Sequence, residues 1–191
     1  MSVGAGEVIV VSGLPRSGTS MMMKMLARGG VDVLVDEVRG PDPHNPGGYF
    51  ELEAVKRLAR GEVDWLTGAP GRAVKVVAPL LRYLPVDYNY RVVFMRRRLA
   101  DTLASQRVML DRLGHDPAPD GPDPHEAVVA QLDDVTDWLT DQPQFEVRYF
   151  SYERVLADPL AAVESLIRFL GRPLDRQRAT AVVDPALRRQ S

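Results

Sequence analysis

Residues 8–20 read VIVVSGLPRSGTS, and this stretch decides the fold. Val8–Val11 is a β-branched run without alternation, which predicts a short strand buried on both faces, as in a parallel sheet. Ser12–Gly18 is rich in glycine and proline and predicts a turn. The residues of Thr19–Arg28 include strong helix formers, and Gly29 predicts the end of that helix. The order of strand, glycine loop and helix is the first half of a β-α-β unit.

The rest of the chain alternates apolar runs with helical patterns. The runs with strand character are Val31–Val35, Ala73–Ala78, Arg91–Met95 and Phe145–Phe150. Helices are predicted over Glu51–Arg60, Leu99–Leu113, Glu126–Leu139 and Pro159–Leu170, loops over Gly40–Gly48 and Pro117–Pro124, and partly helical structure in the tail from Leu174 to Ser191. This alternation predicts an α/β fold, a three-layer sandwich with a mostly parallel central sheet.

The composition excludes several classes of protein. Of the 191 residues, 45% are hydrophobic and 26% charged, and the formal net charge is −2, unlike the basic charge of a protein that coats nucleic acid. The chain has no cysteine, which excludes disulfides, thiolate metal sites and a cysteine nucleophile. The N-terminus has no signal-peptide pattern, and no apolar run approaches the roughly 20 residues that span a bilayer. We therefore expect a cytoplasmic protein without nucleic-acid or membrane partners.

The glycine loop has the properties of a phosphate-binding loop. Successive backbone N–H groups in such a loop point at an anion, and the positive end of the following helix dipole adds to the attraction. In the triphosphate-binding pattern G-x-x-x-x-G-K-S/T, a lysine reaches the outer phosphates, but Thr19 stands at that position here. A cation is present three residues earlier, at Arg16. The strand run that ends at Met95 leads into Arg96–Arg98 rather than to a metal-binding aspartate. The loop is therefore predicted to bind phosphate through arginine and backbone groups, without Mg²⁺.

Four segments resemble the sulfotransferase superfamily. The family's 5′-phosphosulfate loop, P-R/K-S-G-T-S/T, is matched by Pro15, Arg16, Ser17, Gly18, Thr19 and Ser20. Arg97, with Ser105 eight residues later, resembles the pair that binds the 3′-phosphate in such proteins. Tyr152 and Glu153, followed by Asp158 and Pro159, resemble the family's Y-E-D-L…D-P stretch, whose tyrosine lies near the nucleotide. Residues 45–51 resemble the N-P-x-G-Y-F-E segment of bacterial members.

The resemblance covers roughly residues 8–172 and implies a P-loop NTPase-like fold in a single sulfotransferase-like domain over residues 1–191. It also implies transfer of a sulfuryl group from 3′-phosphoadenosine-5′-phosphosulfate (PAPS), a co-substrate used without a metal, to a hydroxyl or amine of a small-molecule acceptor. In the implied site, Arg16 and the N–H groups of Ser17–Ser20 neutralise the leaving phosphate, and Lys75 is a second cation. The family's C-terminal R-K-G loop is missing, and Arg188 and Arg189 are candidates to replace its charge on the 3′-phosphate.

The general base remains open at this point. The family's K-T-H-x-P motif reads KVVAP over residues 75–79, so Val77 stands where the hormone- and phenol-sulfating members have a histidine. A carboxylate takes this role in other branches, and the order of preference here is Glu51, Glu37 and Asp36, with His44 as a further candidate.

Two alternative functions stay open beside the sulfotransferase. One is a small-molecule or nucleotide kinase with the same loop topology. The other is a module that binds phosphoadenosine without catalysis. A homo-oligomer in which a partner subunit completes the acceptor pocket is also open, because the chain is short.

Overall fold

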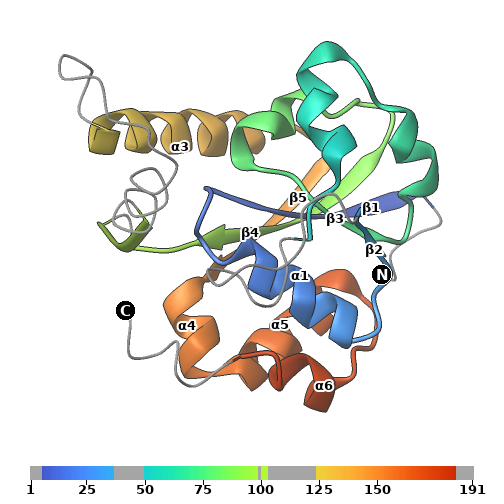
Figure 1. Cartoon of the computed structure of the whole chain (residues 1–191), viewed down its shortest axis with the longest axis vertical. Helices are drawn as coiled ribbons and strands as arrows, with labels where there is room; N and C mark the ends of the chain where they lie inside the picture. The colour runs from blue at the N-terminus through green and yellow to red at the C-terminus, as the bar shows by residue number, and fades with distance from the viewer. Residues whose placement is uncertain (1–5, 37–49, 99, 103–123, 184–191) are drawn as a thin grey trace.

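The computed structural model describes residues 6–36, 50–98, 100–102 and 124–183, with the side chains of residues 124–128 left out. Its centre is a five-stranded sheet (Figure 1). The strands are β1 (Glu7–Gly13), β2 (Val33–Leu34), β3 (Ala73–Lys75), β4 (Asn89–Arg96) and β5 (Phe145–Ser151). Their order is β2-β3-β1-β4-β5, and all four neighbouring pairs are parallel. The predicted α/β sandwich is confirmed, with a sheet that is parallel in all its described pairs.

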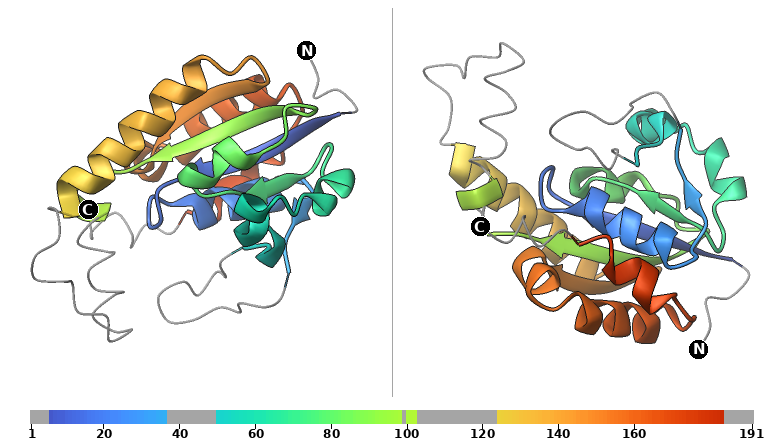
Figure 2. Two further views of the ribbon diagram at one scale, coloured as in Figure 1. Left: turned by 90° about the horizontal axis from the view of Figure 1, so that it is seen from above. Right: turned by 60° about the horizontal axis from the view of Figure 1, so that its bottom comes forward.

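Helices cover both faces of this sheet. One face is covered by α1 (Thr19–Arg28), α4 (Tyr152–Ala157), α5 (Pro159–Leu170) and α6 (Arg176–Thr180). The other face is covered by α3 (Pro124–Thr140) and three 3₁₀ helices, η1 (Glu53–Arg60), η2 (Asp64–Gly68) and η3 (Ala78–Tyr83). Figure 2 shows in two further views that α3 lies on one side of the sheet and the helices α4 to α6 on the other. No helix in the described part of the chain is both long and apolar enough to cross a membrane.

The first predicted strand is the central one, and its burial explains its sequence. Val8, Ile9, Val10 and Val11 have no exposed surface. Ile9 and Val11 pack into the core beneath α1 and α5, whereas Val8 and Val10 pack into the core beneath α3 and the 3₁₀ helices. Because both faces are covered, every position of the strand is apolar and no alternation appears.

Several elements are shorter or tighter than predicted. Strand β2 has two residues instead of the five of Val31–Val35, and β3 ends at Lys75 instead of Ala78. The helix η3 begins at Ala78, and Pro79 in its first turn has no N–H with which to continue a strand ladder. The helix predicted over Glu51–Arg60 is a 3₁₀ helix. The short helices α4 and η2 were not predicted.

Three other predictions are only partly testable. Of the helix predicted over Leu99–Leu113, residues 100–102 are helical, and the others lie outside the described residues. The predicted loop Gly40–Gly48 and most of Pro117–Pro124 also lie outside them. In the tail, α6 confirms partial helicity up to residue 183.

Candidate functional site

Three strand ends bring the candidate site residues to one edge of the sheet. Strands β3, β1 and β4 are neighbours and parallel, so their carboxyl ends lie together. Lys75 ends β3, the glycine loop follows β1, and Arg97 follows β4. The loop therefore lies between the two cations, an arrangement that follows from the strand order β3-β1-β4.

The loop turns through left-handed backbone conformations. Arg16 has φ of 73°, and Gly18, which precedes the first turn of α1, has φ of 96°. The Ser17 N–H donates to the Leu14 carbonyl at 3.2 Å and closes the turn. Gly18 has no side chain with which to cap the first N–H groups of α1, and these groups with the helix dipole suit a bound anion.

Tyr152 packs directly against the loop at Gly18. The side chain is buried, and a Cβ atom built on Gly18 would lie 2.5 Å from its Cδ2 atom. Burial raises the pKa of the Tyr152 phenol, while the nearby Arg97 and Arg16 act to lower it. The ring is therefore an uncharged wall of the loop at neutral pH.

Gly18→Ala is expected to lower Tm by about 5–15 °C, because a left-handed backbone costs alanine about 1–2 kcal/mol and the overlap with Tyr152 adds about 1–3 kcal/mol. Gly61→Ala is the matched control. Gly61 has φ of 78°, but nothing lies within 4 Å of its added Cβ. That variant should lose only the backbone part, about 2–8 °C, in a thermal melt. Equal losses for the two variants would contradict the tight Gly18–Tyr152 contact.

Arg97 connects the loop to Tyr152. Its Nη1 atom donates to the Arg16 carbonyl at 3.3 Å, and its Cζ atom lies 4.7 Å from the centroid of the Tyr152 ring. Among the described residues, its buried Nε atom has no hydrogen-bond partner. The guanidinium is thus held by one carbonyl and one ring, and an N–H group remains for an anion.

On the other side of the loop, Lys75 lies between α1 and the carboxylate of Glu51. Its Nζ atom is 3.4 Å from the Ser20 hydroxyl and 3.2 Å from Glu51 Oε1, and the side chain is 7% exposed. The exposed Lys56 lies 4.0 Å from the other Glu51 oxygen. The structure thus brings together three predicted residues, Lys75, Ser20 and Glu51.

Asp36, the third candidate for the base, supports the backbone around Glu51. Its N–H donates to the Glu51 carbonyl at 3.0 Å, and its carboxylate accepts the Glu53 N–H at the start of η1. The Asp36 carboxylate therefore stabilises the backbone of the segment that contains Glu51.

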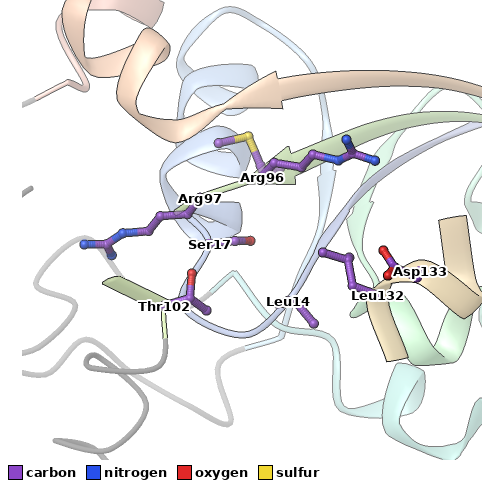
Figure 3. Close-up of a pocket in the computed structure, with 8 residues that line it drawn as sticks. Leu14, Ser17, Arg96, Arg97, Thr102, Leu132 and Asp133 are labelled. Carbon is purple, nitrogen blue, oxygen red and sulfur yellow. The ribbon is translucent and has the colours of Figure 1, made fainter. Parts of the chain in front are cut away.

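A pocket of about 170 Å³ lies on the β4 side of the loop (Figure 3). It is lined by Leu14, Ser17, Met95, Arg96, Arg97, Thr102, Leu132 and Asp133. Figure 3 shows Ser17 between Arg97 on one side and the α3 residues Leu132 and Asp133 on the other. Ser17 is 2% exposed, and its hydroxyl has no hydrogen-bond partner in the described ranges. The volume is below the roughly 300–1,000 Å³ of whole-ligand pockets, so this pocket suits one small polar group of a ligand.

Six of these lining residues were not among the predicted site residues: Leu14, Met95, Arg96, Thr102, Leu132 and Asp133. Thr102 lies in the predicted helix after Arg97, but no motif marks it. Leu132 and Asp133 belong to an amphipathic helix whose pattern predicts burial and gives no sign of a site. Only the docking of α3 beside β4 and β5 brings them to the loop.

Several predicted site residues lie outside the described residues. They are Glu37, His44, Ser105, Arg188 and Arg189, together with residues 45–49 of the N-P-x-G-Y-F-E resemblance. Within the described ranges, no group of three or more histidine, aspartate or glutamate side chains is arranged to hold a metal ion.

Comparison with known proteins agrees with this architecture. A family model described as "Sulfotransferase domain" matches residues 126–187, which include β5, α4 and Tyr152. A search of curated protein sequences finds no match.

Solved structures with a similar fold are sulfotransferases. The sulfotransferase domain of the Synechococcus PCC 7002 olefin synthase is 14% identical, over 95% of this chain and 82% of that chain, with a TM-score of 0.52. Mouse sulfotransferase SULT7A1, complexed with 3′-phosphoadenosine-5′-phosphate (PAP), is 15% identical, over 100% of this chain and 66% of that chain, with a TM-score of 0.56. Sulfotransferase STF1 from Mycobacterium tuberculosis is 17% identical over 95% and 71%, with a TM-score of 0.57. The resemblance predicted from the loop and strand motifs is confirmed: this chain has the fold of the sulfotransferases, and its C-terminal third matches their domain family.

Proposed function

We propose that this protein is a PAPS-dependent sulfotransferase that sulfates a hydroxyl or amine of a small-molecule acceptor, and that residues 1–191 form one sulfotransferase-like domain. A cytoplasmic location and a homo-oligomer remain predictions from the sequence.

The observation that carries the proposal is a phosphate loop with one cation on each side. Lys75 approaches the loop helix at Ser20, and Arg97 holds the loop carbonyl of Arg16. PAPS carries two separate anionic groups, the 5′-phosphosulfate and the 3′-phosphate, which suit two separated cations. Among the described residues, the Ser17 hydroxyl and Arg97 Nε have no hydrogen-bond partner, which supports the fit, because buried polar groups in native proteins are normally satisfied.

The proposed donor contacts follow from this arrangement. Pro15 and Arg16, with the N–H groups of Ser17, Gly18, Thr19 and Ser20, would hold the 5′-phosphosulfate. Arg97 would bind the 3′-phosphate together with Ser105, and Tyr152 would lie beside the nucleotide. Contacts from Arg188 and Arg189 to the 3′-phosphate are proposed on the sequence alone. The PAP in the mouse SULT7A1 structure supports this choice of donor.

The proposed reaction is an in-line displacement at sulfur. The acceptor oxygen or nitrogen forms a bond to sulfur, the bond from sulfur to the 5′-phosphate oxygen breaks, and PAP leaves with the electron pair. Glu51 takes up the proton that the attacking hydroxyl or amine of the acceptor loses. Arg16 and Lys75 stabilise the negative charge that grows on the leaving phosphate and on the sulfuryl oxygens.

Glu51→Gln is expected to lower kcat by about 10²–10⁴-fold, because the amide cannot accept the acceptor proton. Binding of PAP should stay within about threefold of wild type, since a general base contributes to the proton transfer rather than to donor binding. Glu53→Gln is the control, because Glu53 is a neighbouring glutamate paired with Lys56 at 2.7 Å. Product formation can be followed with PAPS and a panel of phenols, alcohols and amines. Wild-type turnover by Glu51→Gln would transfer the role to Glu37 or His44.

Nucleotide binding separates the proposal from a kinase. We expect PAP to bind without Mg²⁺ and more tightly than ATP with Mg²⁺, because Thr19 replaces the lysine that reaches a triphosphate. Titration calorimetry with both ligands measures this. Tighter Mg²⁺-ATP binding would support the kinase. PAP binding without transfer to any acceptor in the panel would support the non-catalytic module.

A further inference from the structure

The carboxylate of Glu153 extends the contact between β4 and β5 beyond the end of the sheet. The last residue pair of these strands is Arg96 with Ser151. Two residues further along β4's path, the Arg98 N–H donates to Glu153 Oε1 at 2.9 Å. The Ser151 hydroxyl donates to Glu153 Oε2 at 2.7 Å and accepts the Arg154 N–H at 3.3 Å. Both carboxylate oxygens therefore accept a hydrogen bond, one from the segment after β4 and one from the last residue of β5.

The charge state of Glu153 suits this bridging role. Partial burial acts to raise the pKa of the carboxyl group, but the hydrogen bonds from the Arg98 N–H and the Ser151 hydroxyl outweigh it, so the pKa is lowered. An ionised carboxylate accepts both bonds at once. A glutamine would keep one carbonyl oxygen for the Arg98 N–H and lose the acceptor of the Ser151 hydroxyl.

The hydrogen bond between Glu153 and the Arg98 N–H lies next in sequence to both Arg97 and Tyr152, whose side chains contact each other. Arg97 is adjacent to Arg98 in the chain, and Tyr152 is adjacent to Glu153. The guanidinium of Arg97 lies over the Tyr152 ring at 4.7 Å, so one carboxylate ties together the two backbone segments from which these side chains extend. Without it, the segment after β4 keeps the Arg97 contacts to the ring and to the Arg16 carbonyl but loses its backbone anchor to α4.

We infer that Glu153 is a positioning residue of the donor site, which fixes Arg97 for contact with the 3′-phosphate while touching no part of the donor itself. The inference rests on the proposed function. Glu153 thus belongs to the site although it is negatively charged, a property that by itself would argue against a role in binding an anion.

The test compares PAP with adenosine 5′-phosphate, which differs from it only by the 3′-phosphate. By titration calorimetry, Glu153→Ala should weaken PAP binding about tenfold and adenosine 5′-phosphate less than twofold, with Glu153→Gln in between, because a displaced Arg97 affects mainly the 3′-phosphate contact. Glu146→Ala is the matched control. Glu146 lies on β5 and pairs with Arg91 at 3.5 Å, away from the loop, so its removal should change neither affinity.

A double-mutant cycle with Arg97→Ala shows whether Glu153 acts through Arg97. If it does, Glu153→Ala should cause no further loss of PAP affinity in the Arg97→Ala background. Additive losses, or equal losses for both nucleotides in Glu153→Ala or in Glu153→Gln, would overturn the inference and leave Glu153 a fold-stabilising residue. A wild-type protein that binds PAP no better than adenosine 5′-phosphate would overturn the proposed function itself, and the inference with it.

Discussion

Arg97→Ala is expected to weaken PAP binding by about 10–150-fold, since hydrogen bonds to charged groups contribute about 1.5–3 kcal/mol and each 1.4 kcal/mol is tenfold in affinity. Adenosine 5′-phosphate should lose less than about threefold, because it lacks the 3′-phosphate that the arginine would contact. Titration calorimetry with the two nucleotides measures the difference directly. The variant also loses the bond to the Arg16 carbonyl and the contact with the Tyr152 ring, so its Tm should be recorded in parallel.

Arg98→Ala is the control for this result. It removes one arginine from the same run of three, but the Arg98 side chain is exposed and does not line the pocket beside the loop. Its backbone N–H, which bonds to Glu153, is kept. We expect PAP affinity within about twofold of wild type, since exposed charges contribute little at physiological salt. Equal losses of both nucleotides in Arg97→Ala would show that Arg97 only supports the loop, and the 3′-phosphate assignment would be wrong.

Lys75→Met is expected to lower kcat by about 10²–10³-fold, the usual cost of removing one donor that stabilises charge in a transition state. The methionine retains the length of the buried side chain, so the change removes mainly the ammonium group. PAP, which lacks the sulfuryl group, should bind within about fivefold of wild type if Lys75 acts on that group. Rates should be compared under saturating PAPS with the fastest acceptor from the panel. Loss of the buried partner also leaves Glu51 without its closer cation, which lowers stability as well.

The variant Lys56→Met is the control that distinguishes a catalytic role of Lys75 from its role as an ion-pair partner of Glu51. Both lysines face the Glu51 carboxylate, but the Lys56 side chain is 55% exposed and lies 4.0 Å from it. Lys75 also contacts α1, through Ser20. We expect kcat of Lys56→Met within about twofold of wild type, since exposed ion pairs contribute little. Similar losses in both variants would mean that Lys75 matters only as a partner of Glu51.

Residues 8–29 show how much local sequence determines. The helix Thr19–Arg28 has the predicted bounds, whereas the strand predicted over Val8–Val11 extends over Glu7–Gly13, so that the turn begins two residues later than predicted. Each depends on neighbours a few positions away: a β-branched run, glycines that permit left-handed backbone and a glycine that ends the helix. The phosphate binding proposed for the loop is equally local, because it would come from backbone N–H groups.

Other elements depend on packing that local patterns do not contain. The apolar run Ala73–Ala78 reads as one strand, yet β3 ends at Lys75, and the chain turns into η3 to cover the sheet. The segment after Glu51 has a helical pattern but adopts the tighter 3₁₀ geometry of η1, held at its start by Asp36. The difference between helix types is small in intrinsic energy, so tertiary contacts decide it.

The amino-acid sequence was thus enough to predict the α/β class, the glycine loop and Lys75 and Arg97 as the cations proposed to flank it. Only the tertiary structure paired Lys75 with Glu51, placed Leu132 and Asp133 of α3 beside the loop, and joined Glu153 to Arg98. The physical reason is distance along the chain. Propensity and periodicity act over a few residues, whereas these contacts join positions from 24 to more than 100 residues apart, which the strand order β2-β3-β1-β4-β5 and the packing of the helices on the sheet bring together.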